Sequence, residues 1–190
     1  MDRLLALLLK PHVTYAVRSS GADEDSPARS LAGQLDSYLF VPPQDVSRRI
    51  AAVWASAFNE RLRAYRSERK LDVLPIAPSV IVQEMTDAEV AGVAFSADPV
   101  SGRRSVAIVS GGWGLGSGLV SGEGAADTWQ VGRDGTVLDR HVVPKTTAHR
   151  HAPGSPEGIA ATPVPFTHQH QPCLTDEQVK TVAAFARKVE

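Results

Sequence analysis

The sequence contains a single cysteine, Cys173, so no disulfide can form within the chain. A lone thiol suits a reducing compartment, and we expect a cytoplasmic protein. The sequence also has almost no excess of charge, because 20 Lys and Arg residues stand against 21 Asp and Glu residues. A chain without a basic field does not attract nucleic acid or an anionic membrane, so we expect neither as a partner.

Long hydrophobic runs are also missing. The apolar stretch Leu4–Leu9 is six residues long and is followed by Lys10 and Pro11. It is too short to cross a membrane, and no small-residue cleavage site of a signal peptide follows it. We predict a short helix from about Asp2 to Lys10, with Pro11 ending it.

The residues that are present indicate a packed α+β domain, with 43% hydrophobic and 22% charged residues. Short β-branched or alternating runs predict strands at 13–17, 37–41, 79–85, 90–95, 106–109, 128–131 and 136–143. The strand at 79–85 reads as a central one. Apolar residues at three- and four-residue steps predict a helix over 45–70, and a capping box at Thr175 predicts a final helix. We divide the chain into a first part (1–78), a β-rich part (79–143), a loop (144–172) and a helix (173–190).

A polar segment follows the first predicted strand. Arg18, Ser19 and Ser20 come directly after that strand, and Gly33 lies further along the loop. Arginine offers a planar set of donors that matches phosphate oxygens, and the serine hydroxyls and loop amides can add neutral donors. The alternative is an ordinary polar loop in which Arg18 pairs with an acidic residue of the run 23–25.

A second segment is rich in glycine, with seven glycines among residues 111–124. Glycine lets the backbone approach a ligand closely, and such loops often hold phosphates through amide donors. No Gly-Lys-Ser/Thr follows, so it is not a Walker A loop, and the glycine spacing does not fit a dinucleotide-binding fingerprint. A flexible surface turn is the alternative reading.

Three further signals are weaker. Gln83, at the end of a predicted strand, can bond an adenine edge, and Met85 beside it can cover the ring. His168 and His170 could present two imidazoles to zinc, but without further ligands we predict no metal site there. No histidine stands in a defensible Ser-His-Asp order, so no catalytic residue is identified.

Taken together, these segments resemble the ATP-binding domain of the phosphoenolpyruvate synthase and pyruvate phosphate dikinase family, which includes rifampicin phosphotransferase. Residues 16–27 are similar to its AVRSSAxxEDxP signature, and residues 30–39 to SFAGQxDTYL. Residues 54–66 resemble its hASLFxxRAxxYR helix, and residues 80–85 its VxVQxM strand. Residues 91–102, 113–122 and 174–179 resemble SGVxFTxxPxTG, WGLGExVVxG and the start of a late helix. The motifs occur in the family's order over nearly the whole chain.

The resemblance implies an ATP-grasp-like mixed sheet with flanking helices, with ATP lying between two subdomains. It implies that Arg18 binds ATP phosphates, with Ser19, Gly33 and Ser37 beside them, and that Gln83 and the backbone near Met85 meet the adenine. It also implies Mg²⁺ in the complete enzyme. Phosphoryl transfer then runs from ATP through a histidine on a separate swivelling domain to pyruvate or a drug hydroxyl.

Five departures from the family pattern bear on activity. The family's opening lysine segment, its magnesium-binding DxEWA strand and its swivelling histidine domain are not in this sequence, so we expect a partial ATP-binding domain over 1–190, incomplete at both ends. The missing domains would lie in the same or another chain. Ser117 stands where the family usually has Glu, and residues 144–172 match poorly apart from Lys145. Two alternatives stay open: a non-catalytic nucleotide-binding or interaction protein, and part of a rifampicin-type antibiotic phosphotransferase.

Overall fold

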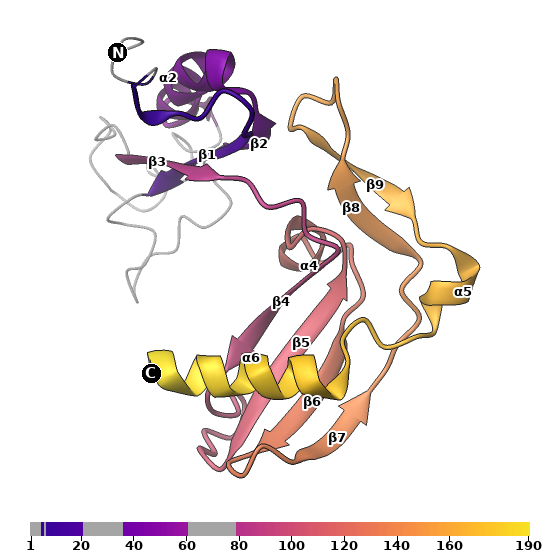
Figure 1. Cartoon of the computed structure of the whole chain (residues 1–190). Helices are drawn as coiled ribbons and strands as arrows, with labels where there is room; N and C mark the ends of the chain where they lie inside the picture. The colour runs from indigo at the N-terminus through magenta and orange to yellow at the C-terminus, as the bar shows by residue number, and fades with distance from the viewer. Residues whose placement is uncertain (1–4, 6, 21–35, 61–78) are drawn as a thin grey trace. The chain divides into compact units, whose positions relative to one another are not determined.

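The computed structural model describes residues 5, 7–20, 36–60 and 79–190. The chain divides into two compact units, each with its own sheet. Unit 1 comprises Met1–Thr86 and Ala152–Ile159, and unit 2 comprises Asp87–His151 and Ala160–Glu190 (Figure 1). Residues 21–35 and 61–78, which include Gly33 and the second half of the helix predicted over 45–70, lie outside the described residues.

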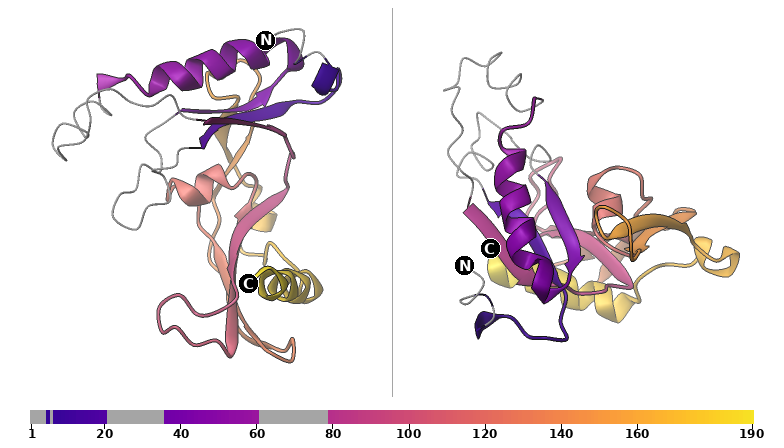
Figure 2. Two further views of the ribbon diagram at one scale, coloured as in Figure 1. Left: turned by 90° about the vertical axis from the view of Figure 1, so that its left-hand side faces the viewer. Right: turned by 90° about the horizontal axis from the view of Figure 1, so that it is seen from above.

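Unit 1 is a three-stranded antiparallel sheet covered on one face by a helix. The strands β1 (Tyr15–Ser20), β2 (Ser37–Val41) and β3 (Ser79–Glu84) lie in the order β2-β1-β3. The short 3₁₀ helix η1 (Pro43–Asp45) leads into α2 (Val46–Ser56), which lies along the sheet (Figure 2). The central strand is therefore β1. The prediction that 79–85 is central was wrong in the described sheet, because β3 pairs only with β1.

Side-chain alternation separates the two faces of this sheet. Tyr15 and Val17 of β1 and Val80 and Val82 of β3 point towards α2, since these residues share one core cluster with its buried face. That face of α2 consists of Val46, Ile50 and Val53. The amphipathic pattern predicted for this helix is thus confirmed over 46–56. On the face of the sheet opposite α2, called the open face below, Arg18, Ile81 and Gln83 are exposed.

A β-bulge adjusts the pairing of β1 with β2. Val17 pairs with Tyr38, whereas Tyr15 pairs with Val41, so β2 carries one residue more than β1 between these pairs. Phe40, inside the bulge, has a positive φ of 53°. Because of the extra residue, Val41 joins the core while Ser37 lies opposite Arg18 on the open face.

Unit 2 is built on a four-stranded antiparallel sheet in the order β4-β5-β6-β7. Its strands are β4 (Val90–Phe95), β5 (Val106–Trp113), β6 (Asp127–Gly132) and β7 (Val137–His141). The short helix α4 (Ser117–Val120) follows β5. All pairings within the two larger sheets are antiparallel, and the ATP-grasp-like mixed sheet stays a prediction.

The sequence analysis predicted a loop over residues 144–172, but the structure has two strands and a short helix there. β8 (Thr147–His151) and β9 (Ile159–Pro163) form a two-stranded sheet, and α5 (Phe166–Gln169) follows. The strands escaped prediction because they carry little apolar alternation: only Ala148 is buried among the residues of β8. Their tip belongs to unit 1, where the Leu39 amide donates to the Glu157 carbonyl at 3.2 Å.

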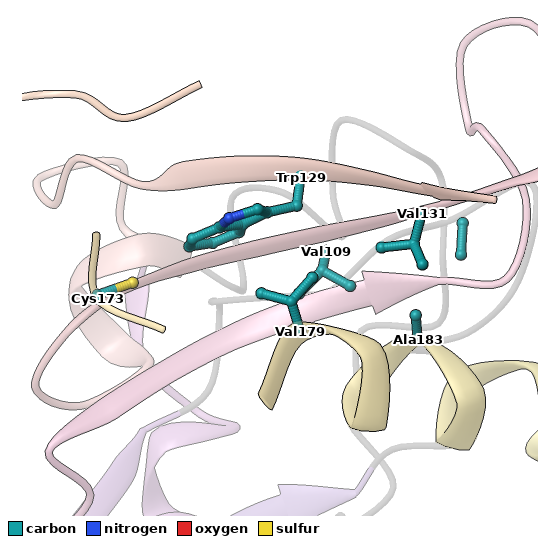
Figure 3. Close-up of a cluster of buried hydrophobic side chains, with 7 residues drawn as sticks. Val109, Trp129, Val131, Cys173, Val179 and Ala183 are labelled. Atoms are coloured by element: carbon teal, nitrogen blue, oxygen red, sulfur yellow. The ribbon is translucent and has the colours of Figure 1, made fainter. Parts of the chain in front are cut away.

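The last helix, α6 (Asp176–Val189), covers one face of the unit 2 sheet. Its buried residues Val179 and Ala183 pack on Val109, Trp129 and Val131 (Figure 3). The capping box predicted at Thr175 is confirmed, since its hydroxyl accepts from the Gln178 amide while the Gln178 side chain accepts from the Thr175 amide. The chain is thus a mixed α and β protein with few helices, and none of its described helices is long and apolar enough to cross a membrane.

Candidate nucleotide site

The open face of the unit 1 sheet brings several predicted site residues together. Arg18, on the central strand, pairs with Ser37 on one side and with Ile81 on the other. Directly paired residues in a sheet point to the same face with their Cβ atoms about 5 Å apart. Arg18 and Ser37 therefore stand side by side on the face that α2 leaves uncovered, and both are exposed.

Gln83 lies on the same face, two residues along β3 from Ile81. It pairs with Ala16, so its side chain is a diagonal neighbour of Arg18, at a Cα separation of about 7 to 8 Å. Met85 follows β3, is half-buried, and donates its amide to the Thr14 carbonyl at 2.8 Å. Arg18, Ser37 and Gln83, which come from three different strands, thus share one sheet face, a patch that offers a cation, a hydroxyl and an amide, and Met85 follows the last of these strands.

The structure does not bring Ser19 into this patch. Ser19 alternates with Arg18 along β1, pairs with Val80, and is 5% exposed on the side of α2. A strand sends successive side chains to opposite faces, so one strand cannot present both residues to the same ligand. Gly33, the remaining predicted site residue, lies outside the described residues.

The electrostatics of the patch favour an anion. Arg18 is exposed and forms no ion pair with any acidic residue that the structure describes. Glu84 of the same sheet forms an ion pair with Lys10, with 2.5 Å between Oε1 and Nζ. This hydrogen bond raises the pKa of the Lys10 ammonium. An exposed guanidinium that pairs with no acidic residue in the described part of the chain is a suitable group for phosphate oxygens.

The glycine-rich segment is ordered by its own hydrogen bonds. Its first two glycines belong to β5, and residues 114–124, the glycine-rich turn, follow. Among the residues that the structure describes, nine of the eleven amides in this turn find a protein acceptor, and those of Gly116 and Ser117 do not. The turn is therefore not the flexible surface turn considered above, and few of its amides remain to hold a phosphate.

His149 of β8 joins this turn through its side chain. Its Nδ1 lies 3.0 Å from Ser117 Oγ, and its Nε2 lies 3.0 Å from Glu123 Oε2. This group was not predicted, because Ser117 and Glu123 lie in a turn and His149 lies in a strand that the sequence analysis missed. His168 and His170 lie at α5, where His168 stacks near Trp113; no group of three or more His, Cys, Asp or Glu that could hold a metal occurs in the described ranges.

Sequence reasoning also missed a buried ion pair in unit 2. Lys145 Nζ lies 2.6 Å from Asp127 Oδ1, and both side chains are completely buried. Asp127 accepts from the Val143 amide as well, and its second oxygen accepts from the Cys173 amide. The pair thus ties the start of β6 to the segment after β7 and to the segment before α6. A Lys and an Asp eighteen residues apart carry no local signal of this contact.

Comparison with known proteins gives one family over almost the whole chain. Residues 3–190 match the profile described as pyruvate phosphate dikinase, AMP/ATP-binding domain. A rifampicin phosphotransferase of Streptomyces sviceus is 41% identical over 93% of this chain and 20% of its own length. A probable phosphoenolpyruvate synthase of Methanocaldococcus jannaschii is 31% identical over 100% of this chain and 16% of its own. The prodigiosin synthesizing transferase PigC of Serratia marcescens is 35% identical over 92% of this chain and 19% of its own length. The chain thus spans about a fifth of the length of these relatives.

Proposed function

Because this chain belongs to the pyruvate phosphate dikinase AMP/ATP-binding family, we propose that it is the ATP-binding part of a phosphotransferase. The complete enzyme would pass a phosphoryl group from ATP through a histidine to pyruvate or a related acceptor. The observation that carries the proposal is that Arg18, Ser37 and Gln83 are exposed together on the sheet face opposite α2. We further propose an ATP-grasp-like arrangement and a cytoplasmic location.

Each residue of the patch has a chemical task in this proposal. Arg18 donates to phosphate oxygens and neutralises part of their charge, which is the main protein contribution in phosphoryl transfer. The Ser37 hydroxyl adds a neutral donor beside it. Gln83 has both an amide donor and an acceptor for the adenine edge, and Met85 supplies a polarisable apolar surface for the ring.

Magnesium belongs to the proposal for the complete enzyme. It would supply charge neutralisation between phosphate oxygens. Its preferred ligands are carboxylates and waters, and the described residues offer no cluster of three potential side-chain ligands. We therefore name no magnesium ligand in this chain.

Two forms of the proposed function differ in the molecule that accepts the phosphoryl group. The rifampicin phosphotransferase at 41% identity favours a drug hydroxyl, and the probable phosphoenolpyruvate synthase favours pyruvate. A third version is a nucleotide-binding protein without catalysis. All three require ATP to bind, so nucleotide binding is the property to test first.

The test is titration of the 190-residue chain with ATP, followed by calorimetry or a fluorescent analogue. Arg18→Ala should weaken binding roughly tenfold or more, since a charge-assisted hydrogen bond contributes about 1.5–3 kcal/mol. Arg18→Lys should recover only part of it, because an ammonium lacks the planar fork. Arg48→Ala is the matched control: Arg48 lies on α2 and pairs with Asp45 at 3.2 Å, away from the open face. If Arg18→Ala and the unmodified chain bind ATP with equal affinity, the proposal is contradicted.

A further inference from the structure

Ile81 is an apolar residue exposed in the middle of the candidate nucleotide site of unit 1. It is 40% exposed, and among the described residues of β1, β2 and β3 it is the one large apolar side chain that is exposed. It pairs directly with Arg18 of β1 and stands two residues before Gln83 on its own strand. Since alternate residues of a strand point to the same side, Ile81 shares the open face with both candidates.

Four side chains of β1 and β3 form two crossed diagonals on this face. Arg18 pairs with Ile81, and Ala16 pairs with Gln83, so each polar residue stands opposite an apolar one. The cation and the amide occupy one diagonal, and the two apolar residues occupy the other. Diagonal neighbours lie about 7 to 8 Å apart, so the apolar diagonal crosses the space between Arg18 and Gln83. Because Ala16 is only 9% exposed, the accessible apolar surface at the crossing is that of Ile81.

This arrangement matches the two kinds of surface on a nucleobase. The edge of an adenine ring forms hydrogen bonds, whereas its two faces are apolar and gain free energy when they leave water. Small-molecule sites accordingly combine apolar contact surface with a few placed polar groups. A nucleotide whose phosphates meet Arg18 and whose base edge meets Gln83 extends from one residue to the other. Ile81 is the exposed apolar side chain beneath that span.

We propose that Ile81 contacts the face of the nucleotide base and is a specificity-determining residue for ligands that carry a base. The inference rests on the proposed function, because it concerns the same bound ATP. Every residue that it uses belongs to one sheet of unit 1. The base is then held at its edge by Gln83 and at its face by Ile81.

The test compares two ligands on the 190-residue chain: ATP, and inorganic tripolyphosphate, which carries the phosphates without a base. Ile81→Ala should weaken ATP binding roughly fivefold, which corresponds to about 1 kcal/mol, because the lost aliphatic groups no longer cover the ring. The same variant should bind tripolyphosphate as the unmodified chain does. Arg18→Ala should weaken the binding of both ligands.

Further variants guard against a folding defect. Ile81→Thr keeps the β-branched shape that suits a strand but has less apolar surface, so it should weaken ATP binding as Ile81→Ala does. Ile81→Leu keeps the apolar surface and should retain most of the affinity. Leu138→Ala is the matched control, because Leu138 is a 57% exposed aliphatic residue of β7 in unit 2. It should change the affinity for neither ligand.

A direct measurement needs no substitution. In the ATP complex of the unmodified chain, with its isoleucine methyl groups labelled, nuclear Overhauser effects should connect the Ile81 methyl groups with the adenine protons H2 or H8. Effects from Ile81 to neither adenine proton in the saturated complex would overturn the proposed contact.

The binding data separate this inference from the proposed function. If Arg18→Ala weakens ATP binding while Ile81→Ala and Ile81→Thr bind ATP like the unmodified chain, the role of Ile81 is overturned alone. An equal loss of affinity for ATP and tripolyphosphate in Ile81→Thr also overturns it, because such a loss does not involve the base. If the unmodified chain binds no ATP, or binds it independently of Arg18, the proposed function fails and this inference fails with it.

Discussion

The Lys145 ammonium lies 2.6 Å from Asp127 Oδ1, and neither side chain has any exposed surface. Lys145 also donates to the Val143 carbonyl at 2.8 Å. Asp127 is satisfied by three donors in all, including the Val143 and Cys173 amides. A buried charge is tolerated only when it is paired and hydrogen-bonded, and this pair meets that condition.

Removing one partner should therefore destabilise unit 2 severely. Lys145→Met leaves the Asp127 carboxylate buried without its cation, and we expect a loss of about 3–5 kcal/mol in the free energy of unfolding. The measurement is urea denaturation followed by tryptophan fluorescence, since Trp129 belongs to the core of this unit. Arg48→Met, which removes an exposed ion pair, should change the free energy by less than about 1 kcal/mol. A loss for Lys145→Met as small as that of the control would contradict this account.

The thiol of Cys173 should be nearly unreactive in the folded protein. Burial, aided by the neighbouring Asp127 carboxylate, raises its pKa from the ordinary value near 9 to about 12. The thiolate is the reactive form, so at pH 8 labelling by a disulfide reagent should be roughly 100-fold slower or more in the folded chain than in urea. A folded-state labelling rate close to the rate in urea would show that the thiol is accessible.

The same shift predicts a loss of stability at alkaline pH. Between about pH 9 and 12 the unfolded chain has lost the thiol proton while the folded chain keeps it. The unfolded state then binds fewer protons, so the free energy of unfolding falls as pH rises through this window. Cys173→Ala lacks the titrating group and should show a shallower decline than the parent chain in parallel denaturation curves. Curves of equal slope would argue against it.

Gly114 and Gly122 offer a matched pair for the glycine-rich turn. Both have a positive φ, 81° and 78°, which costs any other L-residue about 1–2 kcal/mol. An added Cβ at Gly114 would in addition collide with the carbonyl oxygen of His149, whereas at Gly122 it would meet nothing within 4 Å. Gly114→Ala should therefore lower the unfolding free energy by clearly more than Gly122→Ala, as measured by denaturation. Equal costs would mean that the turn does not pack tightly on β8.

Local signals in the sequence were sufficient for several elements. The strands at 37–41 and 90–95 have the predicted bounds. The capping box at Thr175 was predictable because the Thr-x-x-Gln pattern acts on its own backbone neighbours. The apolar steps of α2 likewise revealed which of its faces is buried.

Other elements depend on their neighbours. β5 continues through Gly111 and Gly112, residues that weaken an isolated strand. The glycines are needed for close packing: a Cβ at Gly111 would lie 3.3 Å from the Cys173 sulfur, and one at Gly112 would lie 2.8 Å from the Ala125 carbonyl oxygen. β8 has few apolar residues, so its sequence shows no alternation of apolar and polar side chains. Its strand conformation depends on its pairing with β9 and on its contact with the glycine-rich turn.

The sequence by itself determined the family, the helix and strand types of its strongly patterned segments, and the candidates Arg18, Ser37 and Gln83. These follow from short-range chemistry, in which a residue and its near neighbours suffice. Only the tertiary structure decided which of the candidates share a face, that Ser19 turns away, and that Lys145 meets Asp127 and His149 meets Ser117. Strand register and long-range pairing set those relations, because a shift of one residue exchanges the two faces of a strand.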